Sequence, residues 1–169
     1  MKRAAGLLAI SGVAFLLLGG SQQDRVPRIV WNASASVPIG LYAVRPAGQP
    51  AVGDLVAVRP PQRVAEWLDN RGFLDRDALL LKRIAAVDGA IICRHEATVL
   101  IDGLPAATAA RRDRFGRELP VWRGCRRLGK GEVFLLNADQ PQSLDGRYFG
   151  PFDAGMIGGR VLPLWTRGG

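Results

Sequence analysis

Short apolar runs separated by glycine and proline are the feature that most constrains how this chain can fold. The sequence has 21 glycines and 11 prolines among its 169 residues. Apolar runs of strand length that are bounded by such turn-forming residues favour β-strands over helices. We therefore expect a mainly β domain. Its expected strands lie over residues 41–44, 54–59, 79–87, 90–95, 98–101, 132–136 and 156–165.

One amphipathic helix is expected over residues 62–71, Q-R-V-A-E-W-L-D-N-R. Val64, Trp67 and Leu68 share a face there, and Gly72 can cap the end of the helix. Residues 105–130, which are rich in Ala, Arg and Gly, are expected to form an irregular excursion from the sheet. We expect neither internal repeats nor a second domain.

The N-terminus indicates export from the cytoplasm. Lys2 and Arg3 precede an uncharged apolar stretch that runs to Gly20. As a helix this stretch would span roughly 26 Å, close to the lower limit for crossing a bilayer. The positive-inside rule keeps Lys2 and Arg3 in the cytoplasm. We expect an uncleaved membrane anchor at 1–22, followed by a polar linker to about residue 30 and an exported domain over 23–169. A cleaved signal peptide is the alternative.

The net charge bears on whether the chain binds nucleic acid or lipid, and the two cysteines bear on whether it holds a metal ion or a disulfide. The formal net charge is +8, and it is +6 without Lys2 and Arg3, because 21 basic residues then face 15 acidic ones. No recognition motif or aromatic platform accompanies these charges, so nucleic-acid binding is not expected and anionic lipid headgroups are the simpler partner. Cys93 and Cys125 lack the spacing of a metal site. In an exported domain they could form a disulfide, and the sequence leaves that pairing open.

Two serines in the stretch W-N-A-S-A-S-V-P, Ser34 and Ser36, raise the question of nucleophilic catalysis. A serine needs a nearby base to act as a nucleophile. The single histidine, His95, ends an expected strand and fits a surface position better than a catalytic one. Lys82 follows three leucines, and burial there would lower the pKa of its amine enough for it to act as a base. Spacing alone leaves the non-catalytic alternatives open: Lys82 could face solvent, and the two serines could belong to a polar linker.

A third polar stretch, S-L-D-G-R-Y-F-G at 143–150, is rich in turn-forming residues. Asp145 and Arg147 could form a local ion pair that stiffens this loop. Taken alone, such a pair is a common surface feature.

In their order along the chain, these segments resemble the boxes of the membrane-bound signal peptidase family, and most closely those of its conjugative-transfer branch, the TraF-type peptidases. The resemblance covers residues 32–165. Its serine box is S-V-P-I-G-L-Y at 36–42, its Gly-Asp strand is G-D-L-V-A-V at 53–58, and its lysine box is L-L-K-R-I-A-A-V-D-G at 80–89. The last box is S-L-D-G-R-Y-F-G at 143–150.

The resemblance implies a role for each matching residue. Ser36 would be the nucleophile and Lys82 its general base. Ser34 and the backbone N–H of Ser36 would donate hydrogen bonds to the oxyanion. Ser143 would orient the lysine amine. Asp145, Arg147 and Arg83 would support the site.

The resemblance also implies a fold and a function. The fold would be the coiled β-sheet of signal peptidases behind one N-terminal transmembrane helix. The activity would be serine endopeptidase cleavage at the periplasmic side of a bacterial inner membrane, with no cofactor and no metal. The partners would be the lipid bilayer and a membrane-embedded precursor with small residues before the cut. We expect this precursor to be a conjugative pilin subunit, matured and in some systems cyclised. The alternatives are a general signal peptidase and a non-catalytic component of a transfer apparatus.

Overall fold

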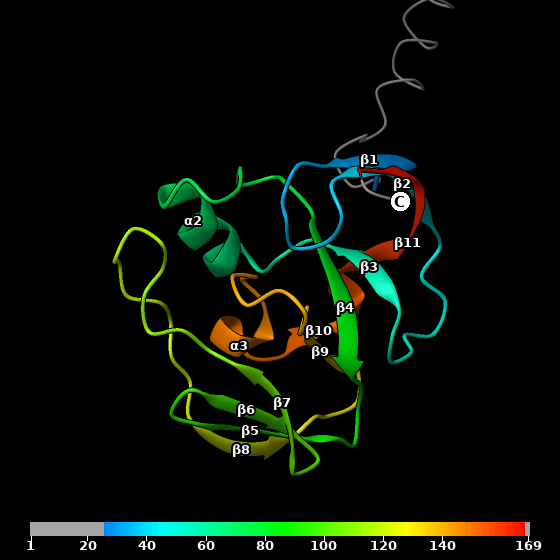
Figure 1. Ribbon diagram of the computed structural model, residues 1–169. Helices are drawn as coiled ribbons and strands as arrows, with labels where there is room; N and C mark the ends of the chain where they lie inside the picture. Colours follow the sequence, from blue (N-terminus) through cyan, green and yellow to red (C-terminus); the bar gives the residue numbers. More distant parts are fainter. Residues whose placement is uncertain (1–25, 168–169) are drawn as a thin grey trace, which may run out of the picture.

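A computed structural model describes residues 26–167, and these residues form two antiparallel β-sheets with short helices beside them (Figure 1). The expected anchor at 1–22 lies outside the described residues. Within 26–167, no helix has the length and apolar character needed to span a bilayer.

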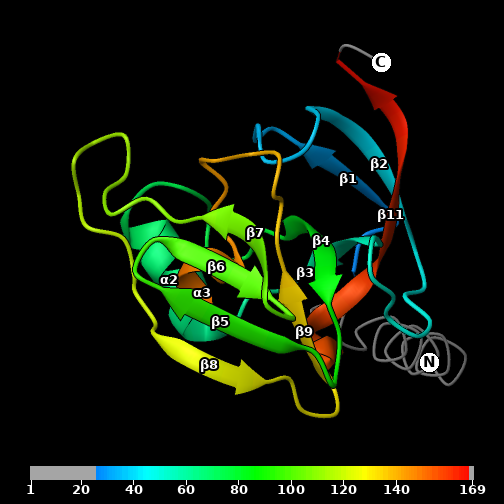
Figure 2. The same ribbon diagram turned by 60° about the horizontal axis from the view of Figure 1, so that its bottom comes forward.

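The larger sheet has seven strands in the order β1-β2-β11-β3-β4-β9-β10. Its register brings β3 against β4, with Val56 opposite Lys82. Register shifts interrupt the pairing of β11 with both β2 and β3, and that of β4 with β9. Such irregularities bend strands, and β11 curves from the centre of the molecule to its edge (Figure 2). The strands are β1 Ile29–Asn32, β2 Gly40–Arg45, β3 Leu55–Val58, β4 Leu80–Ala86, β9 Glu132–Leu135, β10 Phe152–Asp153 and β11 Ile157–Thr166.

The smaller sheet has four strands in the order β7-β6-β5-β8. It lies beyond the end of β4, below the larger sheet in the view of Figure 1. Ile92 and Val99 are fully buried and pack with Phe134 of the larger sheet, which joins the two sheets through one apolar cluster. The strands are β5 Ile91–His95, β6 Thr98–Ile101, β7 Leu104–Thr108 and β8 Gly124–Arg127.

Helix α2, Gln62–Asn70, covers one side of the larger sheet with its apolar face. Val64 and Leu68 are buried against Val58 and Leu135. Gly72 closes the helix at φ 66°, where its N–H donates to Asp69 O and the Phe73 N–H donates to Leu68 O. These two bonds form a Schellman cap, which needs a residue in the left-handed region. A single turn, α3 Gly146–Phe149, and a 3₁₀ turn, η2 Ala154–Met156, complete the helices of the described residues.

The expected mainly β fold is confirmed, as are the helix and the seven expected strands, each to within two residues at either end. Two expectations about irregular segments are wrong. The segment 105–130 contains nearly all of β7 and the whole of β8. Their alanine, glycine and arginine residues are not typical of strands, so the composition did not indicate them. The linker expected up to residue 30 already contains the start of β1, because Ile29 and Val30 pair with β2.

Candidate active site

The two serines lie on the loop between β1 and β2, and their hydroxyl oxygens are 3.0 Å apart. Asn32, which is buried at the end of β1, organises this loop. Its Nδ2 donates to the carbonyls of Ser34, Val37 and Pro38, at 2.8, 3.1 and 3.1 Å. Its Oδ1 accepts from the Ser34 hydroxyl at 2.9 Å. Because Ser34 has one hydroxyl proton, the Ser36 hydroxyl is the donor between the two serines.

Residues after the serines fix the loop to the larger sheet. The buried Tyr42 donates from its hydroxyl to Pro38 O at 2.6 Å. Gly40 lies where β2 meets β11, and a Cβ there would be 2.1 Å from Trp165 O. Only glycine allows the two backbones to approach this closely. Both residues therefore have structural reasons to follow the serines at this spacing.

Lys82 lies in the middle of β4 and is 3% exposed. Its Nζ donates to Ser143 Oγ at 2.9 Å, which joins residues 61 positions apart in the sequence. Burial lowers the pKa of the Lys82 amine to about 8, the Asp145 carboxylate acts in the opposite direction, and Arg147 lowers it further. A lysine with this pKa has a substantial neutral fraction near pH 8 and can accept a proton.

Asp145 and Arg147 form an ion pair that is almost fully buried, with side chains 0% and 1% exposed. Arg147 donates from Nε to one carboxylate oxygen and from an NH2 group to the other, each at 2.9 Å. The same guanidinium donates to Gln140 O at 2.7 Å and to Asn137 O at 3.0 Å. The pair therefore holds the loop that carries Ser143, and it is part of the interior rather than a surface feature.

Gly146, between the paired residues, is also required by packing. A Cβ at this position would lie 2.7 Å from Leu135 O and 2.7 Å from the Phe134 ring. The close approach lets α3 begin directly against β9, with Asp145 accepting a hydrogen bond from the Arg147 N–H as its cap.

Two asparagines that the sequence reasoning did not single out hold the site together. Asn32 shapes the serine loop, and the Asn137 side chain donates to Ser36 O at 2.7 Å and to Leu81 O at 3.2 Å. Asn137 thereby joins the serine loop to the lysine strand. Both asparagines follow apolar strand residues immediately before a turn, the kind of position at which side chains of this type bond to nearby backbone, and that signal could have drawn attention to them.

Other expected or considered residues lie away from this cluster. Arg83 is exposed and its guanidinium donates to Gly53 O at 3.2 Å, because successive residues of a strand face opposite ways. Its backbone contributes instead, with the Arg83 N–H donating to Asn137 Oδ1 at 2.9 Å. Lys130 is exposed in a turn between β8 and β9, and His95 is exposed at the end of β5.

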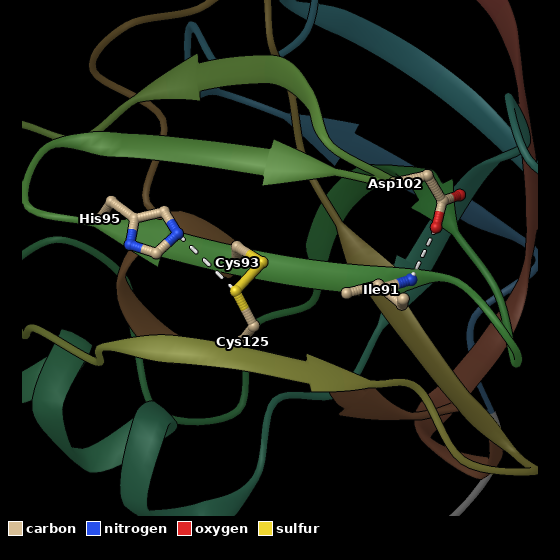
Figure 3. Close-up of a disulfide and its surroundings, with 5 residues drawn as sticks. All are labelled: Ile91, Cys93, His95, Asp102 and Cys125. Atoms are coloured by element: carbon tan, nitrogen blue, oxygen red, sulfur yellow. Dashed lines mark hydrogen bonds between the residues drawn. A yellow bond between two sulfur atoms is a disulfide. The ribbon is translucent and has the colours of Figure 1, made fainter.

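Cys93 and Cys125 form a disulfide between directly paired positions of β5 and β8 (Figure 3). The His95 ring lies beside it, with Nε2 3.7 Å from Cys125 Sγ. Because both sulfurs are bonded to each other, this cluster offers no thiolates to a metal ion. The bond ties the edge strand β8 to the smaller sheet and lies outside the serine–lysine cluster.

The cluster thus places the Ser36 hydroxyl beside that of Ser34. It also places the buried Lys82 amine, whose pKa is lowered, beside the hydroxyl of Ser143. In the described residues, the Ser36 hydroxyl and the Lys82 amine make hydrogen bonds to other partners rather than to each other. Catalytic hydrogen bonds are often formed only when substrate is bound. A hydroxyl nucleophile, a neutral amine base and a nearby oxyanion donor are the components of acyl transfer.

Comparison with known proteins shows that the chain is of the serine peptidase class. The model of the family "Signal peptidase, peptidase S26" matches residues 2–165, and the chain belongs to this family. Two Escherichia coli proteins described as plasmid transfer protein TraF are 31% and 32% identical to the chain. Each alignment spans 176 positions and covers 98% of this chain and 97% of the relative.

A solved structure of a signal peptidase I from Enterococcus faecalis overlaps with 69% of this chain and 99% of its own. Its sequence identity is 16% and its TM-score is 0.43, so this overlap adds no argument to the family assignment.

Proposed function

We propose that the chain is a membrane-anchored serine endopeptidase that uses Ser36 as nucleophile and Lys82 as general base to process an exported precursor. One observation carries the proposal, the burial of Lys82 with its amine hydrogen-bonded to Ser143 and its pKa lowered to about 8. A lysine that served only as a surface charge would point to solvent, because burying an ammonium group is costly.

In the proposed mechanism, the Ser36 hydroxyl turns from Ser34 towards the neutral Lys82 amine as the substrate binds. The amine takes the hydroxyl proton while Ser36 Oγ attacks the scissile carbonyl. The resulting oxyanion accepts hydrogen bonds from the Ser36 N–H and from the Ser34 hydroxyl, whose proton must leave Asn32 Oδ1. The lysine ammonium then protonates the leaving amine, and the peptide C–N bond breaks.

Deacylation repeats these steps with a second nucleophile. Water attacks the acyl–enzyme ester, Lys82 takes its proton, and Ser36 leaves with that proton. If an amine of the substrate replaces water, the product is a cyclic peptide and no water is consumed. The chemistry at Lys82 is the same in both cases.

The precursor we propose is a pilin subunit of a conjugative transfer system. The two TraF relatives, described as plasmid transfer proteins, support this assignment over a general signal peptidase. We expect small residues before the cut, as in Ala-X-Ala, to lie against the serine loop, which itself carries the small residues Ala33 and Ala35.

An exposed apolar surface supports the proposed contact with the bilayer. It is formed by β1 and β11 at one end of the larger sheet (Figure 1). Trp31 and Trp165 both pair with Leu41 of β2, and their rings stack with centroids 6.1 Å apart. Tryptophan is enriched at membrane interfaces. The large apolar side chains that are at least half exposed here are Ile29, Trp31, Leu162, Leu164 and Trp165.

The test is cleavage by the full chain in detergent of a synthetic precursor peptide with alanine at the first and third positions before the cut. Ser36→Ala and Lys82→Ala are expected to abolish cleavage, and Lys130→Ala, a matched change at an exposed lysine, to leave it unchanged. Ser36→Cys introduces the only unpaired cysteine, because the two native cysteines are bonded. A thiol-alkylating reagent should block any residual activity of this variant and spare the wild type.

Processing that persists in both Ser36→Ala and Lys82→Ala would favour the non-catalytic alternative. Deleting the gene in its host separates the other two functions. Loss of conjugation with normal growth is expected for the pilin-processing enzyme, whereas loss of viability would indicate a general signal peptidase.

A further inference from the structure

We propose that Asn137 is the positioning residue that sets the location of Ser36 relative to Lys82. This inference rests on the proposed function, because it assigns a role within the same serine–lysine pair. Neither the sequence resemblance nor the catalytic steps above give Asn137 a role of its own.

The side chain of Asn137 contacts both halves of the pair. Its Nδ2 donates to Ser36 O at 2.7 Å. The same amide group donates to Leu81 O at 3.2 Å, and Oδ1 accepts from the Arg83 N–H at 2.9 Å. Leu81 and Arg83 are the residues on either side of Lys82. One buried carboxamide therefore holds the backbone of the nucleophile and the backbone that flanks the base.

The backbone of Asn137 connects the same point to the third segment of the site. Its N–H donates to Asp145 Oδ2 at 3.1 Å, and its carbonyl accepts from an NH2 group of Arg147 at 3.0 Å. Ser143, which holds the Lys82 amine, lies on the loop between Asn137 and Asp145. All three segments that supply the proposed catalytic groups thus meet at this residue.

The position of Asn137 at the end of β9 explains why an asparagine serves here. β9 pairs with β4 up to Leu135, and the Leu136 N–H still donates to Arg83 O at 2.9 Å. Beyond this point the chain turns away towards Ser143. The Asn137 carboxamide, one acceptor and one donor group in a plane, takes the ladder bonds to β4 that a further peptide group would make.

The geometry of the bonds to Ser36 and Leu81 suits a side chain of this length. The amide donates to carbonyls on two different segments, and neither alanine nor aspartate can supply these donors. Aspartate keeps the shape of the side chain and the acceptor for the Arg83 N–H. It also places a negative charge near Lys82, which favours the ammonium form of the lysine.

The experiment compares Asn137→Ala and Asn137→Asp with the wild type in the peptide-cleavage assay. Both variants are expected to lose kcat by on the order of 10²-fold with little change in KM, because the reacting groups are misplaced while the substrate contacts remain. In Asn137→Asp the midpoint of the pH–rate profile is expected to shift to higher pH. A role in folding alone would not produce that shift.

The control is Val99→Ala, which opens a cavity in the core between the sheets away from the catalytic pair. It should lower thermal stability and leave the kcat and the pH midpoint of the folded enzyme unchanged. Wild-type kcat and pH midpoint in both Asn137 variants would overturn the inference, as would equal losses of kcat in Asn137→Ala and Val99→Ala. Ser36→Ala distinguishes a failure of this inference from a failure of the proposed function, since cleavage by that variant would contradict the proposed function itself.

Discussion

Lys82 Nζ lies 2.9 Å from Ser143 Oγ, although 61 positions separate the two residues. The hydrogen bond connects β4 to the loop that precedes α3. Because Lys82 is only 3% exposed, this hydroxyl rather than water sets the direction of the amine. The position of the proposed base therefore depends on two segments that come together only in the folded protein.

Ser143→Ala should lower the rate of precursor cleavage by roughly 10- to 100-fold, because the amine loses the group that aims it. The loss is expected in kcat, and KM should stay near the wild-type value. Steady-state kinetics on the synthetic precursor measure both. Ser143→Thr retains a hydroxyl and is the matched variant, so a loss in Ser143→Ala that Ser143→Thr shares fully would contradict an orienting role for the hydroxyl.

Lys82→Met should stabilise the fold near pH 7. The folded-state pKa of Lys82, about 8, lies below the ordinary lysine value of 10.5, so the unfolded chain binds more protons between these two pH values. The buried lysine lowers the wild-type free energy of unfolding most below pH 8, by on the order of 3 kcal/mol, and this loss disappears as the pH rises towards 10.5.

Urea unfolding of both proteins across this pH range tests that prediction. The difference in free energy of unfolding should be largest at neutral pH and should shrink with increasing pH. A constant difference would mean that Lys82 does not change its pKa on folding.

Arg147→Ala should destabilise the protein by about 3–5 kcal/mol, because it leaves the Asp145 carboxylate buried without its partner. Arg76→Ala is the control, since Arg76 and Asp69 form an ion pair with side chains 55% and 38% exposed. That exposed pair is worth about 0–1 kcal/mol. Equal losses in the two variants, measured by chemical denaturation, would contradict a structural role for the buried pair.

Replacing both Cys93 and Cys125 by serine should lower stability by about 2–4 kcal/mol, because the disulfide closes a loop over a sequence separation of 32. The specific activity of the folded variant should stay at the wild-type level, since the bond joins strands of the smaller sheet. Thermal unfolding and the cleavage assay give the two values. A large loss of activity at temperatures where the variant is fully folded would connect the smaller sheet to catalysis.

Much of the fold could be predicted because its signals are local. The run L-L-L-K-R-I-A-A-V and the glycines and prolines around the other strands specify β-structure within a few residues. Strands β7 and β8 escaped prediction because their stability comes from pairing with β6 and β5, while β8 itself is exposed throughout. Cross-strand pairing is non-local and leaves little trace in such short segments.

The site residues could be named from motifs, but the contacts among them could not. Local spacing gave no means of knowing that Lys82 is buried, and solvent exposure was the simpler reading of the lysine alone. The burial follows from the loop between Asn137 and Asp145, which brings Ser143 against the Lys82 amine, whereas Arg83 on the same strand points the other way and is exposed. Asn32 and Asn137 escaped notice because an asparagine before a turn is common, and their importance comes from the backbone groups that they join.

The pH dependence of kcat/KM for precursor cleavage tests the central claim most directly, because it reports the pKa of the free enzyme's essential base. With neutral Lys82 as that base, activity should rise with pH through a single midpoint near the lysine's folded-state value of about 8. A profile that stays flat from about pH 6 to about pH 10, or that rises only near the pKa of a free lysine, would contradict the account.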